Sequence, residues 1–309
     1  MAPTRRRPTR RRARRRWAAV AAVTVSVALV GAAAVWAVVA WLDRSMSVPV
    51  VAACTATTGA GAAQLAPAQA DNAALIAAVA VRRGLPARAA TIALATAQQE
   101  SGLVNLAGGD RDSLGLFQQR PSQGWGTPAQ IMDPVHATNT FYDRLVKVPD
   151  YTSLPITQAA QAVQHSAFPD AYADDEPMAR AFASALTGWS PAALTCTLPT
   201  ATTAGSSAAV LARVTRDLGA LPSSSTPADP AARTKATVTL DGTALTPGDP
   251  AHGTWAVAQW SVAVASTLQI DKVQVADRVW TRGATSWTAN DPAPVAAGRV
   301  VITLADGAS

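Results

Sequence analysis

The sequence predicts a mainly α-helical domain after a single N-terminal transmembrane helix, followed by a small C-terminal α+β domain. Three observations lead to this prediction. An uncharged apolar segment covers residues 17–42. Over residues 71–198 apolar side chains recur with helical spacing, and no alternating strand pattern is evident before Cys196. Over residues 235–309 alternating segments appear beside one helical segment.

The N-terminal tail accounts for the basic net charge of the chain. Nine of the first 16 residues are arginine, and none of these 16 is acidic. Outside this tail 26 − 9 = 17 basic residues remain against 20 acidic ones, so the rest of the chain carries a net charge of −3. A basic nucleic-acid surface is therefore not indicated, and we expect no nucleic-acid partner.

Residues 17–42 contain no charged residue, and a predominantly apolar segment of 26 residues is long enough to cross a bilayer. With the basic tail of residues 1–16 on one side, this segment predicts a single-pass cell-membrane protein with a cytoplasmic N-terminus and extracytoplasmic C-terminal domains. Two alternatives stay open: cleavage of the segment as a signal peptide, and lipidation at Cys54, which ends the sequence VAAC.

The chain has two cysteines, Cys54 and Cys196. In an oxidising compartment two cysteines most simply form one disulfide, which here would close a loop of 196 − 54 = 142 residues. Four segments are expected after the apolar segment. A linker covers residues 43–70, and the helical domain covers 71–198. A Ser/Pro/Thr-rich connector with one helix at 208–218 covers 199–234, and the α+β domain covers 235–309.

The helical domain is expected to begin at residue 71. Asp71 or Asn72 can cap the first helix, and Pro86 stands at the first turn of the second, where its missing N–H costs nothing. Between Ala89 and Ala97 the second helix is apolar on nearly every side, which predicts that it is buried. The expected helices cover residues 71–83, 86–100, 128–146, 157–166 and 177–186.

In the C-terminal domain, residues 235–240, 272–280 and 298–305 predict strands, and residues 254–268 predict an amphipathic helix. Four of the nine tryptophans lie in this domain. They either fill a small core or stack on sugars or on a partner. The domain is therefore also a candidate docking surface for a protein partner.

Glu100 is a lone acid at the end of the apolar second helix, on the same face as Ile92 and Thr96. The negative end of the helix dipole and burial both raise the pKa of a carboxyl group, as a general acid near neutral pH requires. The alternative is that Glu100 is only the first polar residue after a buried helix. The candidate substrate-binding residues are Ser101, Asp112, Gln118, Gln119 and Gln164.

A resemblance favours the catalytic interpretation of Glu100. Glu100-Ser101, followed by Gly115-Leu116-Phe117-Gln118, resembles the paired E-S and G-L-M-Q motifs of lytic transglycosylases and goose-type lysozymes. The preceding ALATAQQ resembles the helix that bears their catalytic glutamate, and Asp133-Pro134 with Phe141-Tyr142 is similar to their D-P…Y-L helix. The resemblance covers about residues 71–190.

The resemblance implies a lysozyme-like domain that cleaves the β-1,4 bond between N-acetylmuramic acid and N-acetylglucosamine in peptidoglycan. Glu100 would protonate the leaving oxygen, and then act as base while the 6-hydroxyl of the sugar attacks. Ser101 and Gln118 would orient the acid or the substrate. Where the family has a Y-N-A-G-like motif, this chain has Gln164-His165-Ser166. Tyr172 or Gln164 is the candidate replacement.

Asp110 and Asp112 offer a second carboxylate, which would favour hydrolysis by activating water. They do not begin a calcium loop, because Leu114 and Pro121 stand at ligand positions. We expect no metal and no cofactor, since the three histidines are scattered and no nucleotide-binding loop is present. The alternative function is a non-catalytic lysozyme-like module that binds cell-wall glycan, or a partner in a wall-spanning assembly.

Overall fold

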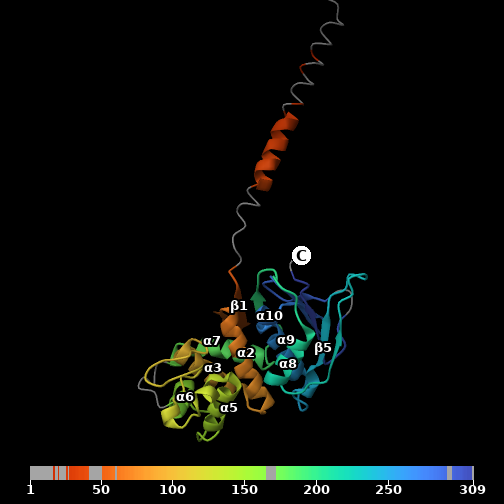
Figure 1. Ribbon diagram of the computed structural model, residues 1–309. Coiled ribbons are helices and arrows are strands. Elements are labelled where there is room, and N and C mark those ends of the chain that lie inside the picture. The colour runs from red at the N-terminus through yellow and green to blue at the C-terminus, as the bar shows by residue number, and fades with distance from the viewer. Residues whose placement is uncertain are drawn as a thin grey trace, which may run out of the picture. The chain divides into compact units, whose positions relative to one another are not determined.

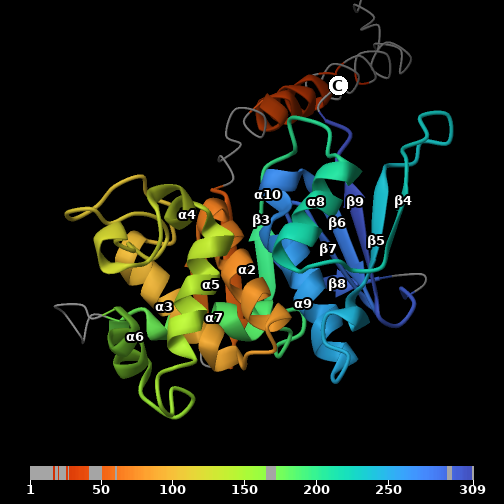
Figure 2. The same ribbon diagram turned by 60° about the horizontal axis from the view of Figure 1, so that its bottom comes forward.

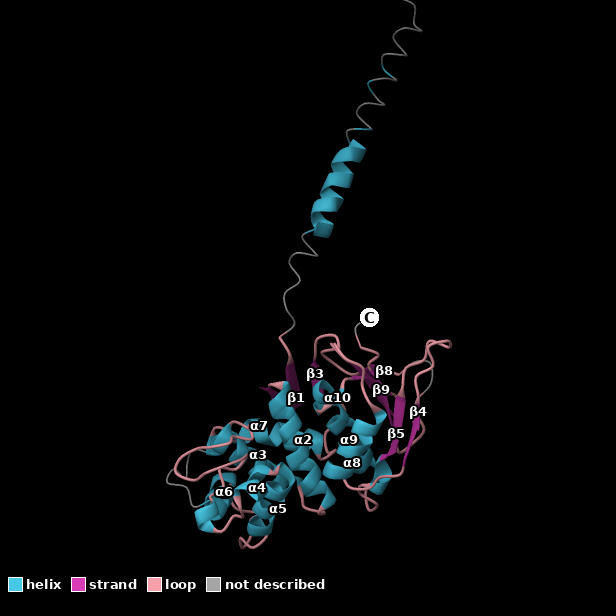
Figure 3. Ribbon diagram, in the orientation of Figure 1, coloured by secondary structure: helices cyan, strands magenta, loops and turns pink. Residues whose placement is uncertain are grey.

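The structure is a computed structural model, and it describes residues 17, 20, 26, 28–41, 51–59, 61–164, 172–290 and 294–307. The chain divides into two compact units, residues 1–49 and residues 50–309. Figure 3 shows that the second unit contains both helices and sheets.

The prediction of a transmembrane helix over residues 17–42 is wrong. Of residues 17–42, the structure describes 17, 20, 26 and 28–41, and all of these are helical. Within the described residues no helix has both the length and the apolar character of a membrane span. The single-pass membrane localisation is therefore not supported. Residues 1–16 and 42–50 lie outside the described residues.

The helical half of the second unit follows the expected order of helices (Figure 1). Proline stands in the first turn of α2, α4, α5 and α7, where its missing N–H removes no helical hydrogen bond. The described helices before residue 194 are α2 (Pro67–Arg82), α3 (Ala87–Ser101), α4 (Pro128–Met132), α5 (Pro134–Leu145), α6 (Ile156–Gln164) and α7 (Glu176–Leu186).

Helix α3 is the central helix of this half. It packs against α2, α6 and α7, and every residue from Ala89 to Ala97 is buried. Five of these nine residues are alanine, which lets the neighbouring helices approach closely. Burial on all sides, as the sequence predicts, leaves only the two ends of α3 available for a site.

A three-stranded antiparallel sheet corrects the expectation of a mainly α fold. The strands β1 (Ala53–Thr58), β2 (Gly61–Leu65) and β3 (Leu194–Thr197) lie in the order β2-β1-β3. With a second sheet described below, the protein is a mixed α/β structure. Strands β1 and β2 lie within residues 43–70, which were expected to form a linker. The sequence did not predict them because their Ala, Thr and Gly residues give no apolar alternation. The sheet is stabilised instead by packing on α7.

The predicted disulfide is confirmed. Cys54 on β1 and Cys196 on β3 are direct cross-strand partners, and their sulfur atoms are bonded. Because Cys54 has no free thiol, lipidation at that residue does not apply. The bond closes a loop across a sequence separation of 142 residues, which stabilises the fold by roughly 4–5 kcal/mol in the chain-entropy account. It joins the two ends of the helical half.

The C-terminal half contains a six-stranded antiparallel sheet in the order β4-β5-β9-β6-β7-β8. Figure 2 shows α8, α9 and α10 along one face of this sheet. Val238, Ile302 and Val273 pair across β5, β9 and β6 and are fully buried. The elements are α8 (Ser207–Asp217), β4 (Ser223–Thr226), β5 (Thr237–Asp241), α9 (Pro250–Ala263), α10 (Ala265–Leu268), β6 (Ile270–Val275), β7 (Arg278–Thr281), β8 (Thr288–Ala289) and β9 (Arg299–Leu304).

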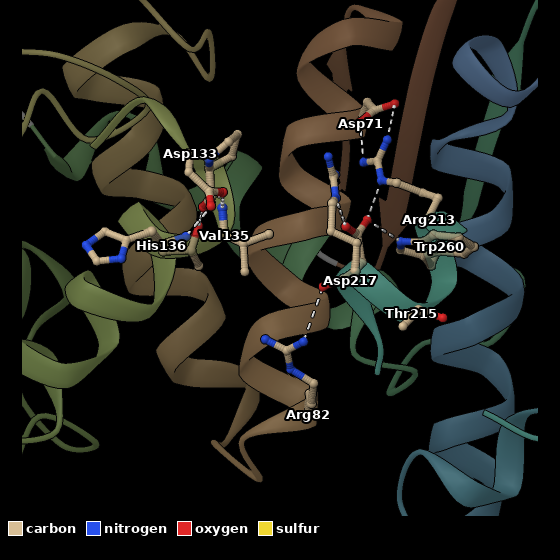
Figure 4. Close-up of polar contacts among 12 residues, drawn as sticks. Asp71, Arg82, Asp133, Val135, His136, Arg213, Thr215, Asp217 and Trp260 are labelled. Carbon is tan, nitrogen blue, oxygen red and sulfur yellow. Dashed lines mark hydrogen bonds and ion pairs between the residues drawn. The ribbon is translucent and has the colours of Figure 1, made fainter. Parts of the chain in front are cut away.

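A buried ionic network joins the two halves of the second unit (Figure 4). Asp217, the last residue of α8, is fully buried. Its carboxylate accepts hydrogen bonds from Arg213 Nε at 2.7 Å, Arg216 Nε at 2.7 Å and the indole of Trp260 on α9 at 3.0 Å. Arg213 also pairs with Asp71 on α2 at 2.5 Å. Two guanidinium groups therefore compensate the buried charge of Asp217, and Arg213 bridges α8 to α2.

Candidate active site

Glu100 lies in the last turn of α3, where the buried helix reaches the surface of the helical half. Gly102 ends the helix with a left-handed backbone, φ 62°, which glycine adopts without strain. Its N–H donates to Gln98 O at 2.8 Å. Glu100 is half-buried and lies at one of the two ends of the helix where a carboxyl group can meet a ligand.

Two side chains of α2 hold the turn that follows Glu100. Gln69 Nε2 donates to Gly102 O, and Asn72 Nδ2 donates to Leu103 O, both at 2.8 Å. Both carbonyl groups follow the end of α3, where no helical N–H remains to bond them. Asn72 was predicted only as a helix cap and Gln69 was not predicted to have a role, because the contacts of both side chains are more than 30 residues away in the sequence.

Tyr172 contacts the carboxyl group of Glu100 directly. Its hydroxyl donates to Glu100 Oε1 at 2.8 Å, and its ring is fully buried. Gln164, at the end of α6, also donates to Glu100 and forms a 2.8 Å bond from Nε2 to Phe117 O. The structure thus brings together the two residues that the sequence offered as replacements for the missing Tyr-Asn pair. His165 and Ser166 lie outside the described residues.

Burial raises the pKa of Glu100 above its ordinary value of 4.5. The hydrogen bonds from Tyr172 and Gln164 act in the opposite direction, because they stabilise the ionised form, but they do not outweigh burial. Among the described residues no cation pairs with this carboxyl group. Glu100 is therefore a carboxyl group that retains its proton to a higher pH than an ordinary glutamate.

Ser101 connects the end of α3 to the turn that bears the G-L-F-Q sequence. Its Oγ lies 2.7 Å from Leu116 O and 3.0 Å from Ala97 O, so its proton is shared between the helix and the turn. At Gly115, φ is 76° and a Cβ would lie 2.8 Å from Ile131 O. Glycine is therefore required there, since any side chain would displace the turn beside Glu100.

The D-P and F-Y residues form a support behind this turn. The side chain of Asp133 caps α5 by accepting from Val135 N at 2.9 Å (Figure 4). Phe141 stacks on Phe117, with ring centroids 4.7 Å apart. Because Phe117 precedes Gln118 in the turn, this aromatic contact fixes the position of the turn relative to α5.

The glutamine pair has two different environments. Gln118 has a left-handed backbone, φ 45°, and its Nε2 donates to Gly115 O at 3.1 Å, so its side chain folds over its own turn. Gln119 is buried, with 1% of its surface exposed, and its Nε2 donates to Ala137 O on α5 at 3.0 Å. The structure thus uses Gln119 to attach the turn to α5.

Asp112 organises the loop before α4. It accepts hydrogen bonds from Arg120 Nε at 2.7 Å, Ser122 N at 2.8 Å and Ser122 Oγ at 3.0 Å. The bond from Arg120, and then those from Ser122, hold the pKa of Asp112 far below its ordinary value. Asp110 is 92% exposed and lies beside Arg111. Among the described residues neither aspartate has a hydrogen bond or ion pair to Glu100.

Within the described residues no group of three or more His, Cys, Asp or Glu side chains is arranged to hold a metal ion. Comparison of the sequence with known protein families finds no match, and comparison with curated proteins finds none either. The function must therefore be argued from the site itself.

Proposed function

We propose that this protein cleaves the glycan strands of peptidoglycan at the β-1,4 bond between N-acetylmuramic acid and N-acetylglucosamine. The observation that supports this proposal is the environment of Glu100: a half-buried carboxyl group with a raised pKa, no cationic partner among the described residues, and a hydrogen bond from a buried tyrosine. Such a carboxyl group is suited to general acid catalysis near neutral pH. The choice of peptidoglycan as the substrate rests on the resemblance of the E-S and G-L-F-Q sequences to the motifs of lytic transglycosylases and goose-type lysozymes.

In the first step the Glu100 carboxyl group donates its proton to the oxygen that links the two sugars. The bond between this oxygen and C1 of the muramyl sugar breaks, and the leaving sugar takes the proton. Glu100 is then a carboxylate, and the hydroxyl of Tyr172 stabilises its charge. In the second step an oxygen nucleophile bonds to C1 and gives its proton to Glu100, which restores the acid.

The environment of Asp112 favours the muramyl 6-hydroxyl over water as this nucleophile. Hydrolysis with inversion needs a second carboxylate that activates water. Asp112 is bonded to Arg120 and Ser122 instead. An internal 6-hydroxyl is already held beside C1, so it needs less help from the protein. The product would be a 1,6-anhydromuramyl end.

One observation favours the non-catalytic alternative, a module that binds glycan without cleaving it. Two neutral donors, Tyr172 and Gln164, both lower the pKa of Glu100. If together they keep Glu100 ionised when glycan is bound, the carboxyl group has no proton to give.

The test is digestion of purified peptidoglycan by the full chain, with the products read by mass spectrometry. Fragments with 1,6-anhydromuramyl ends support the proposal, provided that Glu100→Gln does not produce them. Fragments with reducing ends would show a hydrolase, and would direct attention to Asp110 and Asp112. Intact glycan that pelleted with the folded protein would establish the binding module instead.

A further inference from the structure

A cavity of about 820 Å³ lies on the six-stranded sheet, outside the site around Glu100. This volume falls within the range of small-ligand sites, about 300–1,000 Å³. The face of the sheet that packs on α9 holds the buried apolar residues, and alternation along each strand turns the intervening side chains to the opposite face. Those intervening side chains line the cavity.

Four of the lining side chains form one row across four strands. Thr237 on β5 pairs with Thr303 on β9, Thr303 pairs with Lys272 on β6, and Lys272 pairs with Thr281 on β7. With strands about 4.8 Å apart, three steps give a row of roughly 14 Å. The row presents three hydroxyl groups and one ammonium group to the cavity.

The cavity also contains more positive than negative charge. It is lined by Lys235, Lys272 and Arg282 against the single carboxylate of Asp271, a balance of 3 − 1 = +2. In contrast, residues 51–309 contain 16 basic and 19 acidic residues, a net charge of −3. This local reversal of charge favours an anionic ligand.

Two of these cations form no salt bridge among the described residues, although the carboxylate of Asp271 acts on Arg282 electrostatically. Lys235 is paired, because its Nζ lies 2.5 Å from Asp271 and 3.5 Å from Asp306. Lys272 forms no ion pair with the described residues. Arg282 is half-buried and donates only to backbone carbonyls: Nε to Pro199 O at 2.6 Å, and Nη1 to Ile270 O at 3.0 Å and Ala265 O at 3.1 Å.

Burial lowers the pKa of Arg282, and the nearby carboxylate of Asp271 offsets only part of this effect. A half-buried cation that bonds to no anion costs free energy, and an anion bound beside it would recover part of that cost. Lys272 and Arg282 lie at the β6–β7 end of the threonine row. The anionic group of a ligand therefore belongs at that end, and its uncharged part along the row toward β5.

We infer that this cavity binds the carboxyl end of an extended peptide. The carboxylate would lie between Lys272 and Arg282, and the peptide groups would bond to the threonine hydroxyls, which both donate and accept. Four extended residues span about 14 Å, the length of the row. Leu198, Pro199 and Val301 provide apolar contacts for small side chains. This site goes beyond the proposed glycan cleavage and does not depend on it.

The test compares two peptides in calorimetric titrations of the full chain: tetra-alanine with a free carboxyl end, and the same peptide with an amidated end. The acid is expected to bind at least about tenfold more tightly, because only the acid forms charge-assisted hydrogen bonds. Lys272→Gln should lower the affinity for the peptide with a free carboxyl end about tenfold and leave the affinity for the amidated peptide unchanged. Arg299→Gln is the matched control, since Arg299 is on the same sheet but pairs with Asp241.

Three results would overturn the inference. Equal affinity for the acid and the amide would show that the carboxylate is not recognised. Inorganic phosphate that bound more tightly than the acid would assign the cavity to a phosphate ligand. Absence of binding at millimolar acid would exclude a peptide site. The melting temperature of Lys272→Gln is the control for folding. If it equals that of the unaltered protein, weakened binding is not caused by unfolding.

Discussion

Glu100 and Asp217 are both acidic residues in the last turn of a helix, where the helix dipole disfavours negative charge. Asp217 is the more deeply buried, and two guanidinium groups and an indole surround its carboxylate. Glu100 is half-buried and receives hydrogen bonds only from the neutral groups of Tyr172 and Gln164.

The difference shows that two buried carboxyl groups can have different roles because their partners differ. Loss of the charge of Asp217 would leave its two arginine partners uncompensated inside the protein. The neutral donors of Glu100 can bond to either protonation state with a smaller change in energy. Asp217 is therefore suited to holding α2, α8 and α9 together, and Glu100 to exchanging a proton.

The largest expected effect is that of Glu100→Gln on activity. Removal of a general acid typically lowers the rate by about 10²–10⁴-fold, while the amide fills the same space. We expect cleavage of peptidoglycan to fall by this factor and the melting temperature to stay equal or rise. The chain has one other glutamate, Glu176, which forms an exposed ion pair on α7. Glu176→Gln is therefore the matched control, and a similar loss of activity in both variants would contradict the role of Glu100.

The second prediction concerns stability, and it is the converse of the first. Asp217→Asn removes the anion between two arginines and should lower the free energy of unfolding by about 3–5 kcal/mol. Urea denaturation measures this difference. Asp143→Asn is the control, because Asp143 is 61% exposed in its pair with Arg83 and such pairs contribute less than about 1 kcal/mol. Equal losses in the two variants would show that the network around Asp217 does not stabilise the fold.

The third prediction alters the partner of Glu100 instead of Glu100 itself. Tyr172→Phe removes a hydrogen bond that lowers the pKa of Glu100, so that pKa should rise further. The alkaline limb of the pH–rate profile for glycan cleavage should therefore move to higher pH. The rate below that limb should fall about fivefold, because one hydrogen bond of about 1 kcal/mol to the ionised intermediate is lost. A limb that moved to lower pH would contradict this account.

The smallest effect is the pH dependence of stability. The folded-state pKa of Glu100 is raised above 4.5, so its favourable contribution is complete below pH 4.5 and is lost as pH rises through the folded-state pKa. The stability of Glu100→Gln relative to the unaltered protein should therefore be greater at pH 7.5 than at pH 4. Urea unfolding at both pH values measures it. If the stability of Glu100→Gln relative to the unaltered protein fell as pH rose, the folded-state pKa of Glu100 would be lowered instead.

Several features of the fold follow from local sequence patterns. The apolar run from Ala89 to Ala97 predicts the buried helix α3, and the prolines before the helices mark where they begin. In the C-terminal half, β5 and β9 carry apolar alternation and lie close to their expected positions, whereas the exposed strands β4 and β8 carry none and were not predicted. Two predictions failed: β1 and β2 consist mostly of small residues and gave no strand pattern, and the uncharged segment 17–42 predicted a membrane span that is not found among the described residues.

The sequence by itself determined that α3 is buried and that it ends in a single carboxyl group. It also indicated that the two cysteines pair with each other, which is the simplest arrangement of two cysteines in an oxidising compartment. Tertiary structure alone decided what surrounds those groups. Tyr172 reaches Glu100 across 72 residues, Gln119 is buried against α5, and the cationic cavity is assembled from β5, β6, β7 and β9. The physical reason is that propensity and periodicity act over a few residues, whereas the pKa of a carboxyl group and the charge of a cavity depend on side chains that only the fold brings together.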